Sequence, residues 1–470
     1  MRSFFCTAIA LAMACSCASA YASGDILLVR PVNGVFPNGT LGPMGTGLFS
    51  VDDHGHHLRQ LTPLLPGAYY MPSWVAFNNY TTGVDYWLTK NFSPDGRSIL
   101  YFQNPSADPA DGQYSGKYYI ENVLTGATHP LFAGSNDNAA PGYGYLARDP
   151  ANGNIAAYTN STSEYPVTPA CVYLMHTDGT HQQLLWCAPA DISLPDYPSW
   201  PLQAVESIRW SGNGQKLMVY ASYEPPPLGE LPRKPALASP RSLLTRPTSK
   251  LFATNTATGP VEGSDTGWSA LFVVDVATGT GVEVAANIVD PPSGDISYDG
   301  TKVIYEQYDY AQCGDEDQEA LGDSLCFKDL TTGTVTDLLA PTVWNNQGDY
   351  NGWWRPYWYP EIVLSADGSK AAFTMLQTMG YSEADLFTIN TDGTNLRQLT
   401  SSATAPAAYT GWTPVAWSPD GTRILANRAT LPVSGSLDQT WPSEVHIINA
   451  STGGDTFVTK GYAIDWHEKP

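Results

Sequence analysis

The sequence predicts an all-β fold, a seven-bladed β-propeller of four-stranded antiparallel blades. Three observations lead to this prediction. The 42 Gly and 37 Pro among 470 residues favour many turns and few helices. A Ser-x-Asp-Gly phrase recurs along the chain, and a second phrase, two strands of alternating apolar residues around a Gly turn, follows each copy. Units that repeat in this way are typical of propellers, in which each blade packs against its neighbours.

The first 20 residues predict a secretory signal peptide. A single positive charge at Arg2 precedes an apolar run to about Ala14 and the small residues Ala18-Ser19-Ala20. Lipid attachment at Cys15 or Cys17 is the alternative, although neither cysteine has the usual Leu three positions earlier. We therefore expect a periplasmic or secreted protein with one domain over 21–470 and no transmembrane segment.

Four cysteines follow the signal, and an even number in an exported chain favours disulfides. Cys171 and Cys187 bracket a predicted hairpin, which places them opposite each other, and Cys313 and Cys326 bracket one acidic loop. Zinc is the alternative, but neither pair has C-x₂-C spacing. The predicted pairs are 171–187 and 313–326.

The Ser-x-Asp-Gly phrase resembles a catalytic motif, yet its recurrence in nearly every unit favours a structural turn. In such a turn the Asp bonds its own backbone and the Gly supplies a positive φ. The copies span 92–96, 210–214, 296–300, 364–368 and 417–421, with a degenerate copy at 149–153. We interpret Asp95, Asp299, Asp367 and Asp420 as structural turn residues.

The second phrase has seven copies, whereas the first has six. The chain begins after the signal with a strand at 25–30 that lacks a preceding first strand, and it ends with Ala463-Ile464-Asp465-Trp466, which is similar to the strand before Ser418. We therefore expect the C-terminal strand to complete the N-terminal blade, which closes the ring and protects its edges.

These phrases resemble the TolB-like propeller repeat, a WD-like family of exported bacterial proteins. Ser418-Pro419-Asp420-Gly421 and the stretch from Thr391 to Thr400 carry the resemblance, which extends over the mature chain. The resemblance implies the propeller fold and the bacterial envelope or exterior. It does not imply TolB's role, because the amino-terminal domain of TolB has no counterpart and TolB has six blades.

The long connections between the predicted strands all emerge on one face of the ring, since alternate connections of a four-stranded blade lie on opposite faces. The longest contains a Pro-rich insertion, 224–260. Long surface loops commonly carry binding residues.

Aromatic residues gather in these connections and predict a stacking platform for sugar rings or a peptide. The alternative is that the rings cover the propeller and pack against neighbouring loops. The candidate ligand-binding residues are Trp353, Trp354, Tyr357, Trp358, Trp74, Trp200 and Trp412.

Two further segments contain potential metal ligands. Asp315, Asp317 and Glu319 lie in one acidic loop, where calcium is one interpretation and a solvated loop pinned by the 313–326 disulfide is the other. His54, His56 and His57 share a short turn, for which we favour a solvated turn over a metal site. No cofactor is otherwise expected.

Charge and motifs limit the function. A formal charge of −22 disfavours nucleic acid as a partner, and no hydrolase, zinc-protease or phosphate-loop motif occurs. The leading hypothesis is a non-catalytic, monomeric scaffold that binds a protein, peptide or glycan through its long-loop face. The alternative is a metal-dependent polysaccharide lyase or hydrolase acting at the mouth of the propeller channel.

Overall fold

The structure, a computed structural model, confirms the all-β prediction. All its regular elements are strands, and no helix that could span a membrane occurs within the described part. The described residues are 25–35, 41–63, 69–71, 76–77, 84–85, 91–104, 117–131, 143–160, 169–194, 197–223, 268–288, 294–307, 324–339, 362–376, 383–401, 408–432 and 443–467.

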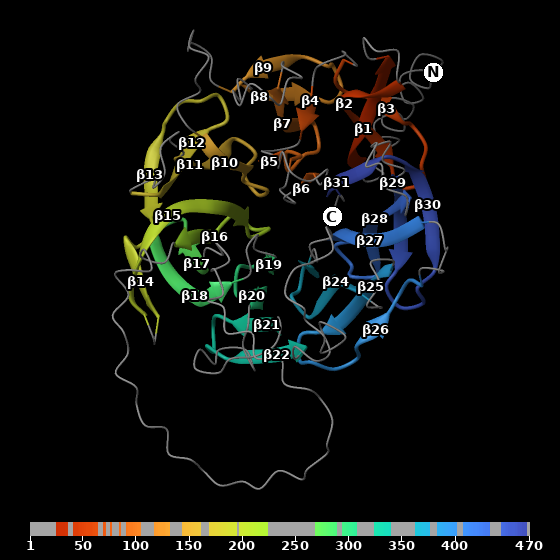
Figure 1. The fold of residues 1–470 in the computed structure, drawn as a ribbon. Coiled ribbons are helices and arrows are strands. Elements are labelled where there is room, and N and C mark those ends of the chain that lie inside the picture. Colours follow the sequence, from red (N-terminus) through yellow and green to blue (C-terminus); the bar gives the residue numbers. More distant parts are fainter. Residues whose placement is uncertain are drawn as a thin grey trace, which may run out of the picture.

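The sheets are arranged around a central axis in the manner of a propeller (Figure 1). The two ends of the chain meet in one sheet of order β3-β2-β1-β31, where Ile26 lies opposite Trp466 and Leu28 opposite Ala463. This pairing is the closure that the sequence predicts. Its strands are β1 (Asp25–Val35), β2 (Leu41–Asp52), β3 (Arg59–Gln60) and β31 (Tyr462–His467).

Two further four-stranded sheets and one small hairpin follow in the ring. The first sheet contains β4 (Tyr69–Met71), β7 (Ser98–Asn104), β8 (Lys117–Asn122) and β9 (Thr128–Pro130). The second contains β10 (Tyr143–Arg148), β11 (Ile155–Asn160), β12 (Cys171–His176) and β13 (Gln183–Cys187). The hairpin pairs β5 (Ala76–Phe77) with β6 (Val84–Asp85).

Two larger sheets complete the ring. The nine-stranded sheet contains β14 (Asp191–Leu194), β15 (Tyr197–Trp210), β16 (Lys216–Tyr223), β17 (Trp268–Asp275), β18 (Thr280–Ile288), β19 (Gly294–Ile296), β20 (Lys302–Gln307), β21 (Ser324–Asp329) and β22 (Val335–Leu339). The eight-stranded sheet contains β23 (Ile362–Leu364), β24 (Lys370–Leu376), β25 (Glu383–Asn390), β26 (Arg397–Gln398), β27 (Ala408–Trp417), β28 (Arg423–Pro432), β29 (Ser443–Asn449) and β30 (Asp455–Lys460).

The described strands therefore form six hydrogen-bonded sheets, whereas the sequence predicts seven blades. Short pairings between consecutive repeat units account for the difference. One residue pair, Ile288 with Gln307, joins β18 to β20. A two-residue parallel pairing, at Glu383 and Ala384, joins β25 to β27. The count of seven separate sheets is thus corrected.

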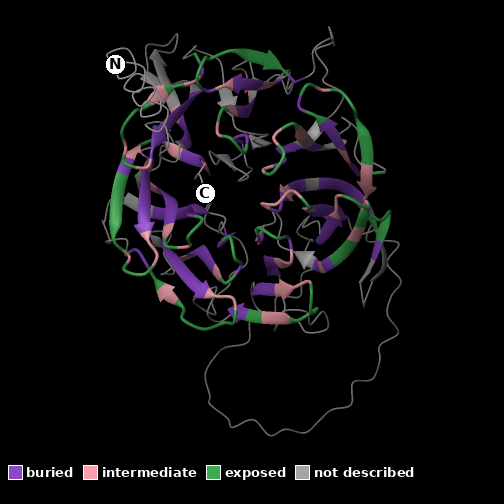
Figure 2. Cartoon of the chain, turned by 180° about the vertical axis from the view of Figure 1, so that it is seen from behind, coloured by how far each residue is buried: buried purple, intermediate pink, exposed green. Residues whose placement is uncertain are grey.

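The core lies between the faces of neighbouring sheets. One apolar cluster joins the first and last sheets through Ile26, Leu28, Leu425 and Val445. The strands at the rim are exposed, as Figure 2 shows, and β9 carries three exposed residues in succession. Burial thus concentrates in the inner and middle strands, where period-two alternation gives way to apolar residues on both faces.

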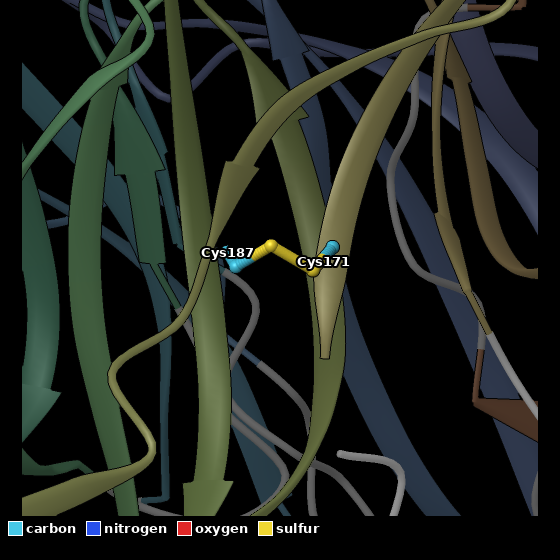
Figure 3. The surroundings of a disulfide bond; sticks show 2 residues. All are labelled: Cys171 and Cys187. Carbon is cyan, nitrogen blue, oxygen red and sulfur yellow. A yellow bond between two sulfur atoms is a disulfide. The ribbon is translucent and has the colours of Figure 1, made fainter. Parts of the chain in front are cut away.

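The disulfide between Cys171 and Cys187 joins two neighbouring strands of one sheet (Figure 3). The two residues are direct partners in the β12–β13 pairing, with their Cα atoms 3.9 Å apart. This bond is the predicted one and is compatible with an extracytoplasmic protein. Cys326 is also disulfide-bonded. Its predicted partner, Cys313, lies outside the described residues, so that pairing stays a prediction.

Candidate functional site

The Ser-x-Asp-Gly turns have the geometry of structural turns. The Ser hydroxyl donates to the Asp carboxylate over 2.6 Å in the pairs 93–95, 297–299 and 418–420 and over 2.7 Å in the pair 365–367. The following Gly has a φ of 65° at Gly96 and 63° at Gly421. Hydrogen bonds from Ser418 and Thr422 lower the pKa of Asp420 to about 2. Each carboxylate is thus occupied by its own turn.

Most of the predicted aromatic platform lies outside the described residues, namely Trp353, Trp354, Tyr357, Trp358 and Trp74. Trp200 is on β15, opposite Ile192. Trp412 is on β27 and is buried, with its ring centroid 5.0 Å from that of His446 and the guanidinium of Arg428 over its face. Ligand binding by these residues therefore stays a prediction.

The predicted calcium residues Asp315, Asp317 and Glu319 also lie outside the described part, so that site stays a prediction. In the histidine turn, Nδ1 of His57 lies 2.8 Å from Asp52 and Nδ1 of His54 lies 2.6 Å from Asp53. Within the described ranges, no three His, Cys, Asp or Glu residues are grouped so that they could hold a metal ion.

A polar cluster occupies the junction between β15 and β19, two strands on the axial side of the ring. Nη1 of Arg209 lies 3.1 Å from Oδ1 of Asp295 and also donates to the carbonyl of Gly294. Asp295 accepts backbone hydrogen bonds from Ile296 and Leu364, each at 2.8 Å. These bonds fix the ion pair against two inner strands, with 16% and 17% of the side chains exposed.

Tyr220, on β16, directs its hydroxyl toward the same place. A Cβ added to Gly294 would lie 2.4 Å from Oη of Tyr220, so the phenol lies directly against this glycine. Tyr220 is 2% exposed, and its hydroxyl has no hydrogen-bond partner among the described residues. Burial is the main cause that raises the pKa of Tyr220, and Arg209 opposes the rise. The phenol therefore keeps its proton at neutral pH.

Glu306, on β20, adds a second carboxyl group to this region. It is 2% exposed, and its charge raises the pKa of Tyr220 together with that of Asp295. Glu306 lies one residue before the end of β20, where a long connection begins, and Gly294 opens β19 directly after another connection. Arg209 and Asp295, in contrast, each lie two residues before the Ser of a short turn, at 211–214 and 297–300. The cluster of Arg209, Tyr220, Asp295 and Glu306, here called the axial cluster, thus extends along the inner part of the ring between its two ends.

Sequence motifs could not reveal the axial cluster, because its members come from four strands without a fixed spacing. One local signal was present. Glu306 interrupts the apolar strand Val303-Ile304-Tyr305 at a position that pairs with Leu325 in the sheet interior. A carboxyl group in such a strand is costly unless it has a partner or a function.

The chain is similar in fold to solved propeller structures. An oligogalacturonate lyase in complex with manganese is 13% identical, with 93% of this chain and 86% of that chain covered and a TM-score of 0.46. The oligogalacturonate lyase of Vibrio parahaemolyticus is 12% identical, with 93% and 87% covered and a TM-score of 0.43. TolB from Acinetobacter baumannii is 13% identical, with 79% and 62% covered and a TM-score of 0.36. No protein family and no curated protein matches the sequence.

These comparisons correct the hypothesis of a non-catalytic scaffold. The similar structures include lyases and propeller-containing peptidases, which are enzymes. The hypothesis relied on the lack of a local catalytic motif. The lack of such a motif does not exclude an enzyme, because in a propeller the functional groups can come from several strands and meet only in the folded protein. The likeness itself concerns the fold alone.

Proposed function

We propose that this protein is a polysaccharide lyase or hydrolase that acts at the mouth of the propeller channel. The observation that carries the proposal is the axial cluster. A buried phenol without a described partner lies against Gly294, beside an ion pair held on two inner strands. Burying such groups together is unfavourable for stability, so a functional use is the natural explanation.

The cluster supplies the groups that cleavage of a glycosidic bond requires. Tyr220 keeps its proton and can donate it to the departing glycosidic oxygen. In this proposal Glu306 accepts a proton, either from a sugar carbon in elimination or from the attacking water in hydrolysis. Arg209 provides positive charge where negative charge develops, and Asp295 fixes its orientation.

An activity assay on purified protein tests the proposal with two readouts. Elimination forms a carbon–carbon double bond that absorbs in the ultraviolet, whereas hydrolysis forms reducing ends without that absorbance. The expected result is cleavage of at least one polysaccharide in a panel of neutral and acidic polymers. No cleavage of any polymer would overturn the proposed activity.

Substitution of one hydroxyl tests the axial cluster itself. Tyr220→Phe should lower kcat by about 100-fold or more, since it removes the proton donor. Tyr118→Phe is the matched control, because Tyr118 is also buried, with its pKa raised by burial, but lies on β8. Equal activity of Tyr220→Phe and the parent protein would remove this cluster from the proposal and leave the activity standing.

A metal requirement is a separate part of the same proposal. The described residues do not form a metal site, so no step above depends on one. Calcium at Asp315, Asp317 and Glu319 stays proposed as a stabilising ion. Added calcium should then raise Tm, and a chelator should lower it, without an effect of either on a variant in which all three are replaced by amides.

The number of blades, the compartment and the processing of the signal peptide are also part of the proposal. We propose that each large sheet consists of two blades, which gives a seven-bladed propeller over 21–470. The disulfide supports export to the periplasm or the exterior. Mass analysis of the mature protein would test cleavage after Ala20 or Ala22 against lipid attachment at Cys15 or Cys17.

A further inference from the structure

Six of the eight histidines of the chain lie on the outer hairpins of three consecutive sheets. All six are exposed. They lie on the end of the ring opposite the long connections, because the hairpin turns of the outer strands emerge there. The residues are His54, His56 and His57 between β2 and β3, His129 on β9, and His176 and His181 at the β12–β13 turn.

The turn between β25 and β26 shows that this backbone does not require histidine. His57, His181 and Asn395 occupy equivalent positions and have φ values of 56°, 56° and 58°. Asn is well suited to this left-handed conformation, and His is tolerated there. Two turns of the same shape therefore carry imidazoles where a third has Asn, so the imidazoles are not needed to form the turn.

The β2–β3 turn holds its imidazoles in a fixed frame. Asp52 accepts hydrogen bonds from the backbone N–H groups of His54 and His56, at 3.0 and 2.7 Å. Gly55 packs so closely on the neighbouring sheet that a Cβ there would lie 2.3 Å from the carbonyl oxygen of Val458. The side chains of the turn are thus presented to solvent on a rigid support.

Few charges face these imidazoles. Asp52 contacts His57, and Asp53 contacts both His54 and Arg423. Arg59 donates to the carbonyl of Leu124 in the next hairpin and lies near the buried Glu121. In the β12–β13 turn, Asp178 is the carboxylate beside the stacked rings of His176 and His181, which are 4.2 Å apart.

Protonation would therefore change the sign of the local charge. Imidazole gains its proton just below neutral pH, and six imidazoles outnumber the three carboxylates at Asp52, Asp53 and Asp178. The overall charge of −22 acts only weakly on this rim, because salt screens charges over about 10 Å. The rim becomes a basic arc on an acidic protein.

Exposed leucines accompany the imidazoles. Leu58 is 43% exposed beside His57, Leu124 is 56% exposed in the β8–β9 turn, and Leu184 is 58% exposed on β13. Aliphatic side chains beside positive charges suit the interface of a lipid bilayer better than a glycan, for which aromatic faces are typical. The combination of imidazoles and exposed leucines therefore favours a lipid bilayer as the partner.

We propose that this rim, named here the histidine rim, docks the protein onto an anionic phospholipid bilayer when the pH falls below neutral. The six imidazoles supply charge that complements the lipid headgroups, and Leu58, Leu124 and Leu184 enter the interface. The proposal is independent of the proposed enzymatic activity, since the histidine rim lies on outer hairpins and the axial cluster on other strands of the ring.

Vesicle co-sedimentation of the mature protein tests the histidine rim. Vesicles of phosphatidylcholine with phosphatidylglycerol are compared with pure phosphatidylcholine, at about pH 5.5 and about pH 7.5, with chelator present. Binding is expected only to the anionic vesicles at the lower pH, and high salt should weaken it. Equal binding at both pH values or to neutral vesicles would overturn the proposal, as would binding that appears only when zinc replaces the chelator.

A triple variant removes the imidazoles without changing the turn. His54→Asp, His56→Thr and His57→Asn copy the β25–β26 turn, whose backbone has the same left-handed residue. The loss of three imidazoles and the gain of one carboxylate at position 54 should weaken binding by about 100-fold at the lower pH. Unchanged binding by this variant would contradict the proposal.

Two leucines in matched turns provide the apolar control. Leu58 and Leu396 occupy equivalent positions and are 43% and 42% exposed, but only Leu58 has imidazole neighbours. Leu58→Ser should weaken vesicle binding, and Leu396→Ser should leave it unchanged. Equal effects of the two substitutions would mean that the contact lies elsewhere on the ring.

Discussion

Consecutive inner strands are joined near the axis by two different kinds of hydrogen bond at nearly the same position. In one kind, a carboxylate on an inner strand accepts backbone N–H groups from the next inner strand. Asp465 bonds Asn91 at 2.8 Å and Phe92 at 3.1 Å, and Asp295 bonds Leu364 at 2.8 Å. Each carboxylate also accepts the N–H of the residue that follows it.

In the other kind, an indole N–H donates to a carbonyl of the preceding inner strand. Trp210 bonds the carbonyl of Ala147 and Trp417 bonds that of Val363, both at 3.0 Å. The difference teaches that each junction satisfies the backbone group its neighbour presents, a donor or an acceptor. Trp210, Trp417, Asp295 and Asp465 therefore each have a structural role at a junction, and a high Trp content does not by itself mark a ligand site.

Removal of the carboxylate at the closing junction should have the largest effect. Asp465→Ala leaves the N–H groups of Asn91, Phe92 and Trp466 without their buried acceptor, where the two ends of the chain meet. The free energy of unfolding should fall by about 4 kcal/mol, measured by urea denaturation. Asp465→Asn keeps one acceptor oxygen and should lose about half as much. Equal stability of Asp465→Ala and the parent would show that the carboxylate does not close the ring.

Local patterns predicted the repeat itself well. The alternation around Gly turns located the hairpins, and the similarity of 463–466 to the strand before Ser418 predicted the β1–β31 pairing, because both depend on short-range periodicity. The cross-strand disulfide at Cys171 followed from the same hairpin geometry. The sheet count could not be predicted, since it depends on the short contacts at Ile288 and Glu383 between units.

The axial cluster lay beyond sequence reasoning for a different reason. Tyr220 and Asp295 become neighbours only where two consecutive repeat units pack together, and the close approach needs Gly294 to lack a side chain. Trp412 shows that residue type alone can also select a residue that has almost no exposed surface for a ligand. It was selected for ligand binding by its residue type and its connection, and it is buried against His446.

Glu121 is a buried carboxyl group on β8, and its ionisation can be compared with the hydrogen-bonded carboxylate of Asp465. Glu121 on β8 is 2% exposed, and burial raises its pKa to about 7, against the opposing effect of Arg59. Its pKa in the folded protein lies above the usual value of 4.5, so its contribution to stability is complete below about pH 4.5 and is lost as the pH rises through about 7. Glu121→Gln should therefore be more stable than the parent by about 2 kcal/mol at pH 8.

Thermal unfolding across pH checks this expectation. The difference in Tm between Glu121→Gln and the parent should grow from about pH 5 to about pH 8 and then level off, because the parent carboxyl group is fully ionised there. A constant difference over this range would mean that Glu121 ionises without a stability change. Arg59→Gln should move the transition of the parent to a higher pH, since it removes the positive charge that favours the ionised form of Glu121.

The smallest effect isolates the indole hydrogen bond. Trp417 is the last residue of β27, and Trp466 lies one residue before the end of β31. Both are buried, at 9% and 5% exposed, but only the indole N–H of Trp417 has a partner among the described residues. Each Trp→Phe substitution removes similar apolar contact, and Trp417→Phe also leaves the carbonyl of Val363 without its donor. Trp417→Phe should therefore cost about 1 kcal/mol more than Trp466→Phe in urea denaturation. Equal losses would show that packing, and not the indole hydrogen bond, joins these two inner strands.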